Sequence, residues 1–159
     1  KDVPRKEVPM NVRTILATKG SNVITVRPHQ TVREAVRLLA YHNIGALVVV
    51  DEASRPVGII SERDIVRAAA RHEDRDISVM QVADIMTSNL ITGTPQDDVH
   101  SVAHTMTERR FRHLPIVEEG RLVGIVSIGD VVKAQRDLYR GEVDTLQTQI
   151  MADELQNET

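Results

Sequence analysis

Two segments of the chain carry nearly the same sequence. Residues 57–68 read VGIISERDIVRA and residues 123–134 read VGIVSIGDVVKA, with seven of twelve positions identical. Upstream, the apolar run ALVVV at residues 46–50 aligns with HLPIV at residues 113–117. An internal repeat of this kind predicts two copies of one structural unit that pack against each other, because a single copy cannot bury its apolar face alone.

Hydrophobic patterning predicts the same order of elements in both copies: strand, helix, strand, strand, helix. In the first copy, Thr31 and Glu34 have the spacing of a capping box at the start of a helix. The predicted elements are a strand at 23–26, a helix beginning at Thr31, strands at 46–50 and 57–60 and a helix at 62–70, then a strand at 90–92, a helix at 98–109, strands at 114–117 and 122–126 and a helix at 127–135.

The fold class that follows is α/β (α+β), with two β-α-β-β-α repeats packed about a pseudo-twofold axis. Halves of about 60 residues are marginal alone, and apolar strands need cover on both faces. Such packing creates two equivalent clefts at the junction. The predicted divisions are an N-terminal extension at 1–11, a first repeat at 12–72, a linker at 73–81, a second repeat at 82–136 and a C-terminal helical tail at 137–159.

Composition argues against several classes of protein. The net charge is −3 and aromatic residues make up only 2%, so neither a general basic field nor a stacking platform is available for nucleic acid. The absence of cysteine excludes disulfides and thiolate metal sites. The longest apolar run, 46–50, is far shorter than the roughly 20 residues of a membrane span, and residues 1–10 lack the apolar stretch of a signal peptide. We therefore expect a cytoplasmic protein without a membrane or nucleic-acid partner.

The repeated motif places Ser61 three residues before Asp64, and Ser127 three residues before Asp130, each directly after an apolar strand. A helix N-terminus with a serine hydroxyl suits a phosphate. An aspartate one turn later can accept hydrogen bonds from both hydroxyls of a ribose. A single Ser-x-x-Asp is more simply a helix cap, but its duplication in register favours a ligand site.

The doubled G-h-h-S-x-x-D motif, in which h is apolar, resembles a pair of CBS domains, named after cystathionine β-synthase and called a Bateman module when paired. The resemblance covers residues 12 to about 135. It implies an adenine-nucleotide-binding regulatory or sensor module that senses energy status through AMP, NAD or ATP and performs no catalysis. AMP and NAD rank ahead of ATP, ADP and S-adenosylmethionine, and no catalytic cofactor is implied.

The resemblance also implies binding residues in two clefts. In the cleft headed by Asp130, Ser127 and Asp130 would hold ribose and phosphate, apolar residues would surround adenine and a basic pair would face the phosphates; these are Ile24, Ile44, Gly45 and Ala46, then Arg112 and His113. The cleft headed by Asp64 would use Ser61, Arg63, Asp64, Ile91, Leu114 and Pro115. Because the first copy has Gly45-Ala46 where the second has Arg112-His113, we expect the Asp130 cleft to be the better phosphate site.

Two alternatives from other classes remain. The same cleft could hydrolyse or transfer a nucleotide, but no G-x-S-x-G elbow accompanies either serine. The protein could also be a structural interaction module with empty clefts. His100 and His104 have the i, i+4 spacing that can hold a metal, yet no H-E-x-x-H pattern surrounds them, so we expect no metal site.

The polar tail after Gln135 carries Leu138, Val143, Leu146 and Ile150 at nearly helical spacing. The simple interpretation is a frayed surface helix, and the preferred one is a helix that packs across a homodimer, as paired CBS modules often do. Gly141 argues against one continuous helix. A regulated protein partner is expected, but the sequence does not identify it.

Overall fold

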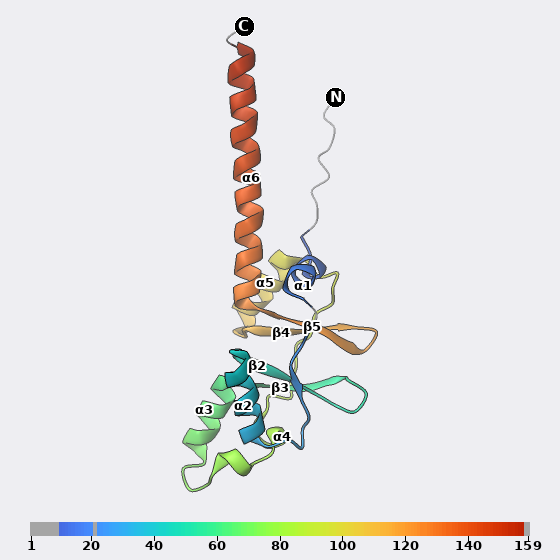
Figure 1. The fold of residues 1–159 in the computed structure, drawn as a ribbon, viewed down its shortest axis with the longest axis vertical. Helices are drawn as coiled ribbons and strands as arrows, with labels where there is room; N and C mark the ends of the chain where they lie inside the picture. Colours follow the sequence, from blue (N-terminus) through green and yellow to red (C-terminus); the bar gives the residue numbers. More distant parts are fainter. Residues whose placement is uncertain (1–9, 21, 158–159) are drawn as a thin grey trace.

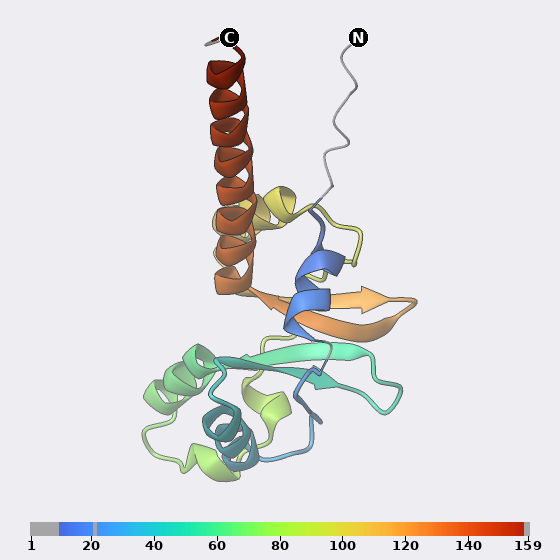
Figure 2. The same ribbon diagram turned by 45° about the horizontal axis from the view of Figure 1, so that its top comes forward.

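The computed structural model describes residues 10–20 and 22–157 and contains two stacked units of mixed α/β structure, which confirms the predicted fold class. In Figures 1 and 2 the strands of both units lie side by side at the centre, with helices outside them. The first unit contains β1 (Thr25–Val26), α2 (Val32–His42), β2 (Ala46–Val50), β3 (Pro56–Ser61) and α3 (Glu62–Arg71). The second contains α5 (Val99–Arg109), β4 (His113–Glu118), β5 (Arg121–Ser127) and α6 (Ile128–Asn157).

Sheet topology follows the repeat. In the first unit the strand order is β1-β2-β3, with β1 parallel and β3 antiparallel to β2, and in the second β4 and β5 form an antiparallel pair. Every residue of β2 is buried. This burial explains the unbroken apolar run at 46–50, since a strand covered on both faces needs no polar alternation.

Each unit packs against a short helix that lies next to the other unit in the sequence. The helix α1 (Val12–Lys19) places Val12 and Ile15 in the core of the second unit, and α4 (Val82–Ile85) places Val82 in the core of the first. The motif glycines permit this exchange. A Cβ at Gly58 would lie 2.5 Å from the Met86 sulfur, and one at Gly124 would lie 2.5 Å from Leu16 Cδ2.

The strand predicted at 90–92 is absent, and β1 covers only half of the predicted 23–26. In the second unit the first strand is reduced to a parallel bridge between Gly93 and Ile116. A Cβ at Gly93 would lie 2.8 Å from Leu114 Cδ2. Glycine at this position therefore allows the close approach of the chain to β4. Within the predicted linker 73–81, residues Ile77–Val79 form a 3₁₀ helix, η1.

Helix capping agrees with the sequence in part. Thr31 accepts a hydrogen bond from the Glu34 backbone N–H at 3.2 Å, as a cap should. Glu34 does not complete a capping box. Its carboxylate accepts a hydrogen bond from the Gln30 side-chain amide at 3.0 Å instead of from the Thr31 backbone N–H. Both reciprocal bonds of a capping box are made at Ser61 and Asp64, and again at Ser127 and Asp130.

The C-terminal helix is longer than predicted. The sequence predicts a helix at 127–135 and a helical tail at 137–159, with Gly141 as an argument against one continuous helix, whereas α6 runs without a break from Ile128 to Asn157. One glycine inside a helix costs only about 1 kcal/mol, which the neighbouring turns offset. Figure 1 shows that the second half of α6 extends well beyond the two units.

Candidate functional site

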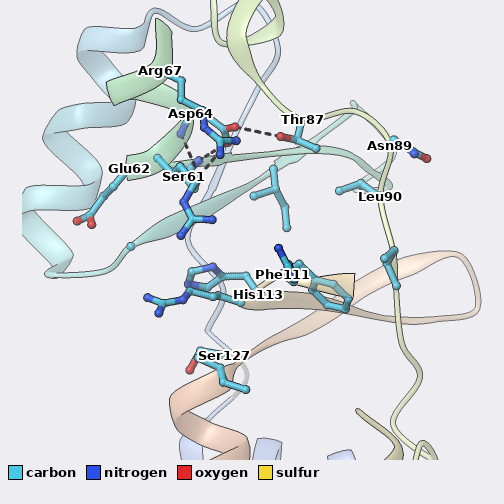
Figure 3. Close-up of a pocket in the computed structure, with 17 residues that line it drawn as sticks. Ser61, Glu62, Asp64, Arg67, Thr87, Asn89, Leu90, Phe111, His113 and Ser127 are labelled. Carbon is cyan, nitrogen blue, oxygen red and sulfur yellow. Dashed lines mark hydrogen bonds between the residues drawn. The ribbon is translucent and has the colours of Figure 1, made fainter. Parts of the chain in front are cut away.

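A cavity of about 590 Å³ lies between the two units. Figure 3 shows that its upper wall comes from the start of α3, its side from the segment after α4, and its lower wall from β4 and the start of α6. The residues that line it are Gly45, Ile59, Ser61, Glu62, Arg63, Asp64, Arg67, Thr87, Asn89, Leu90, Ile91, Arg110, Phe111, Arg112, His113, Ser127 and Ile128.

Asp64 is held rigidly at the upper wall. One carboxylate oxygen, Oδ2, accepts from the Ser61 backbone N–H at 2.8 Å and from the Ser61 hydroxyl at 2.9 Å. The other, Oδ1, accepts from the Thr87 hydroxyl at 3.0 Å (Figure 3). Thr87 is itself fixed to β3 through two backbone hydrogen bonds with Ile59, at 2.8 and 2.9 Å. The partners of Asp64 in this cavity are therefore neutral donors.

Positive charge gathers around this carboxylate. Four arginines line the cavity, against the two carboxylates of Glu62 and Asp64; they are Arg63, Arg67, Arg110 and Arg112. His113 stands with them on β4. Its burial lowers the pKa of His113 below the usual 6.5, and the charges of Lys19 and Arg112 lower it further. The imidazole is therefore neutral at neutral pH, and the arginines supply the positive charge.

Apolar side chains complete the wall. Phe111, the single phenylalanine of the chain, lies beside His113 in Figure 3, with Leu90 across the cavity. Ile59, Ile91 and Ile128 also contribute. The arrangement offers an apolar slot, a carboxylate and a basic rim in one space, which suits a ligand with a flat ring, neighbouring hydroxyls and an anionic group.

The structure gathers eight of the fourteen sequence-predicted site residues into this one cavity: Gly45, Ser61, Arg63, Asp64, Ile91, Arg112, His113 and Ser127. The other six are absent from its wall. Ala46, Leu114 and Pro115 are buried in strands, Ile24 and Ile44 pack against the core of the first unit, and Asp130 lies elsewhere. The grouping thus differs from the expected one, since Arg112, His113 and Ser127 share a cavity with Asp64.

Asp130 is engaged by a cation from α1. Lys19 Nζ lies 2.6 Å from Asp130 Oδ2 and also donates to the Ile125 carbonyl at 2.9 Å. Burial acts to raise the pKa of Asp130, but the hydrogen bonds from Lys19 and Ser127 and the Lys19 charge outweigh it and hold the pKa below its usual value. Asp130 and Lys19 border a separate cavity of about 210 Å³ on the α1 side.

Sequence reasoning missed several lining residues. Arg67 stands four residues after Arg63, so the two share one face of α3, and this spacing was a usable signal. Phe111 was identifiable as a lone aromatic residue within the basic run 109–113. Thr87 and Asn89 carry no comparable signal, because they reach the cavity only through the exchange of α4 between units.

Two further observations concern the described part of the chain. Residues 10–20 and 22–157 contain no group of three or more histidine, cysteine, aspartate or glutamate residues placed to hold a metal ion. His100 instead lies 3.2 Å from the Gln135 side-chain amide. In the same residues, no helix combines the length and apolarity required to span a bilayer.

Two interlocked α/β repeats with a cavity at their junction define a tandem-repeat α/β module. The CBS domain family matches residues 12–71 and 82–137. The chain belongs to the CBS domain family, as a pair of such domains.

Related proteins support this assignment. The chain is 42% identical over 130 residues to a 17.7 kDa protein of Acidianus ambivalens, a match that covers 78% of this chain and 77% of that protein. It is 36% identical over 119 residues to the CBS domain-containing protein YhcV of Bacillus subtilis, which covers 74% of this chain and 82% of that protein.

Solved structures agree. The CBS-domain protein ATU1752 of Agrobacterium tumefaciens superposes with a TM-score of 0.75 at 40% identity, over 79% of this chain and 99% of that one. The CBS domain pair of protein MJ0100, crystallised with 5′-methylthioadenosine and S-adenosylmethionine, superposes with a TM-score of 0.70 at 31% identity, over 84% of this chain and 98% of that one.

Proposed function

We propose that the cavity headed by Asp64 binds an adenosine-containing ligand with one or more phosphates, and that this binding regulates another protein. The observation that carries the proposal is the meeting, in one cavity of about 590 Å³, of a fixed carboxylate and four arginines. The MJ0100 domain pair, which has the same fold, holds two adenosine derivatives. Adenosine is the part common to those ligands and to the nucleotides proposed for this chain.

The proposed roles follow from the chemistry of the wall. Asp64 would accept hydrogen bonds from the ribose hydroxyls. Its present donors are neutral, and a ribose hydroxyl can take the place of one of them, the Thr87 hydroxyl. Phe111 and Leu90 would contact adenine. Arg112 and its neighbours would pair with the phosphates, because guanidinium groups match phosphate oxygens in charge and geometry.

The charge of the residues that line the cavity also ranks the candidate ligands by expected affinity. Four arginines favour an anionic ligand over S-adenosylmethionine, whose sulfonium is positive. We therefore propose AMP or NAD ahead of ATP, ADP and S-adenosylmethionine. We further propose that the protein is not an enzyme, and that ligand occupancy changes how the two repeats pack. Such a change requires different affinities for two packing states.

Calorimetry tests the proposal. The full chain is titrated with AMP, NAD, ATP and S-adenosylmethionine, and with adenosine as the matched ligand without phosphate. We expect AMP and NAD to bind at least about tenfold more tightly than adenosine, since hydrogen bonds to charged groups contribute about 1.5–3 kcal/mol. Mass spectrometry of ligand released from the purified protein gives an independent identification. Equal affinity for adenosine and AMP would overturn the phosphate role, and turnover of AMP, NAD or ATP would establish an enzyme instead.

A further inference from the structure

The two motif aspartates hold the same position on their helices. Asp64 Oδ2 accepts a hydrogen bond from the Ser61 backbone N–H at 2.8 Å, and Asp130 Oδ2 accepts one from the Ser127 backbone N–H at the same distance. Each serine hydroxyl in turn accepts from the backbone N–H of its aspartate at 3.2 Å. Any difference in ligand binding between the two aspartates therefore has to come from the residues around the motif.

The neighbour of Asp130 is a cation that two contacts hold in place. Lys19 Nζ donates to Asp130 Oδ2 at 2.6 Å and to the backbone carbonyl of Ile125 at 2.9 Å. At Asp64 the donor is the neutral hydroxyl of Thr87, at 3.0 Å. A ribose hydroxyl that approaches Asp130 has to compete with a charge-assisted hydrogen bond, whereas one that approaches Asp64 replaces a neutral bond. Lys19 therefore opposes ligand binding at the second motif.

The space around the two aspartates differs in the same direction. Asp64 lines the cavity of about 590 Å³ between the two units. Asp130 borders the cavity of about 210 Å³, whose wall comes from Met10, α1 and α6. The Lys19 side chain is part of that wall and is 37% exposed. Replacing Lys19 with alanine removes the ammonium group and its methylene chain, so that Asp130 faces an enlarged space.

The second motif also lacks most of the positive charge that surrounds the first. Three of the four cavity arginines correspond in the repeat to uncharged residues, at offsets of 66 or 67 residues, and the fourth corresponds to a lysine. The pairs are Arg63 with Gly129, Arg110 with Asn43, Arg112 with Gly45 and Arg67 with Lys133. A phosphate at the second motif would therefore meet one lysine in place of four arginines, which gives a phosphorylated ligand little advantage over adenosine.

We propose that Lys19 keeps the second motif closed to ligands, so that each chain binds one nucleotide, at Asp64. Removing Lys19 opens a second site at Asp130 that takes adenosine with or without a phosphate. The inference rests on the proposed function, because it requires that a motif aspartate accepts hydrogen bonds from ribose hydroxyls. It adds the residue that sets the number of ligands per chain, and it separates the ligand classes of the two motifs.

The stoichiometry of AMP binding to the full chain, measured by calorimetry, tests the role of Lys19. We expect one AMP per natural chain and two per Lys19→Ala chain. Lys19→Gln, whose neutral amide resembles the neutral donor at Asp64, should also bind two. Lys19→Arg keeps the cation and should bind one. Lys133→Ala is the matched control, because it removes another cation that borders the same small cavity and should leave the stoichiometry at one.

The outcomes distinguish this inference from the proposed function. One AMP per chain in both Lys19→Ala and Lys19→Gln, with natural helix content by circular dichroism, overturns the role of Lys19 and leaves the Asp64 site intact. Two AMP per natural chain also overturns it. No binding to the natural chain overturns the proposed function, and the appearance of one site in Lys19→Ala would then still assign Lys19 its role.

Adenosine titration tests the ligand class of the second site. Asp64→Ala weakens the first site, so the remaining binding reports on Asp130. Adding Lys19→Ala should tighten adenosine binding by at least about fivefold, because an ion pair no longer has to be broken. Adding Asp130→Asn as well should abolish that gain. AMP and adenosine should bind the opened site within about threefold of each other, and a preference for AMP of about tenfold or more would overturn the assigned ligand class.

Discussion

The two copies of the Ser-x-x-Asp motif have similar backbones but different neighbours. Asp64 faces a hydroxyl, that of Thr87, whereas Asp130 faces an ammonium group, that of Lys19. In both cases the neighbour comes from the helix region exchanged between units: Thr87 follows α4 and Lys19 ends α1. Thr87 forms backbone hydrogen bonds with Ile59 of β3. On β5, by contrast, the Lys19 side chain donates to the carbonyl of Ile125.

This difference teaches that a duplicated motif need not give duplicated sites. Asp130 already has a charge-assisted hydrogen bond of 2.6 Å, which a ligand must replace before it can use that carboxylate. Asp64 must give up only a neutral hydroxyl. The residue that decides whether each aspartate is available thus lies outside the motif, in the segment supplied by the other repeat.

The largest expected effect distinguishes the two aspartates directly. Asp64→Ala should weaken AMP or NAD binding by about 100-fold, because it removes a charged acceptor for two ribose hydroxyls. Asp130→Ala should weaken it by less than about threefold. Calorimetric titration of both variants measures the contrast. A greater loss from Asp130→Ala would restore the preference that the Gly45-Ala46 versus Arg112-His113 comparison suggested in the sequence.

Asp64 also completes a capping box, so a loss of helix stability has to be separated from a loss of ligand contacts. Thr31→Ala is a matched control, since it removes a side-chain cap from α2 and lies outside the cavity wall. It should cost about 1 kcal/mol of stability. Its ligand affinity should remain close to that of the natural chain.

The next effect concerns the basic rim. Arg112→Ala should weaken phosphate-bearing ligands by about tenfold and leave adenosine binding nearly unchanged, because one charge-assisted contact is lost. Arg109→Ala is the control: Arg109 is exposed at the end of α5 and is absent from the cavity wall. Calorimetry with AMP and adenosine in parallel measures both. An equal loss for the two ligands would assign Arg112 to folding or to the base instead of the phosphate.

The elements of the fold were predictable where the pattern is local. The hairpin of β2 and β3, the helix α5 and the helix starts after Thr31 and Ser61 follow from apolar runs and caps that neighbouring residues determine. The prediction of a strand at 90–92 was wrong: this segment pairs with β4 through a single bridge between Gly93 and Ile116, a long-range contact that the local pattern does not contain. Gly141 argued against one continuous helix, yet α6 continues through it.

The candidate site was predictable in residue types but not in grouping. Ser61 and Asp64 are three residues apart and form a hydrogen bond with each other, so their spacing was sufficient to recognise the motif. Nothing in the sequence indicates that Thr87 would contact Asp64 or that Lys19 would bind Asp130, because both contacts arise from the exchange of α1 and α4. The placement of Arg112 and His113 beside Asp64 has the same tertiary origin.

A smaller effect uses His113, which borders the Asp64 cavity. Its pKa lies below 6.5 in the free protein because of burial and the nearby Lys19 and Arg112 charges. An anionic ligand would raise that pKa, so affinity should increase as pH falls below about 7. NAD is the suitable ligand, since its phosphodiesters do not titrate in this range. His113→Gln should remove the added pH dependence, and an unchanged profile in that variant contradicts the role.

The smallest effect concerns the ion pair that distinguishes the second motif. Lys19→Met should lower the free energy of unfolding by about 1 kcal/mol or less, because solvent partly screens the pair. The folded-state pKa of Asp130 is depressed, so the contribution is fully present above the unfolded value of about 3.9 and is lost as pH falls through the folded pKa. Urea unfolding over a pH series should show the natural chain and the variant converging only in that acidic range. Lys133→Met is the control, because Lys133 borders the same small cavity and makes no ion pair with any described residue. A difference between the natural chain and Lys19→Met that persists below the folded pKa would show that Lys19 stabilises α1 by packing, and the contrast between the two aspartates would then lose its electrostatic basis.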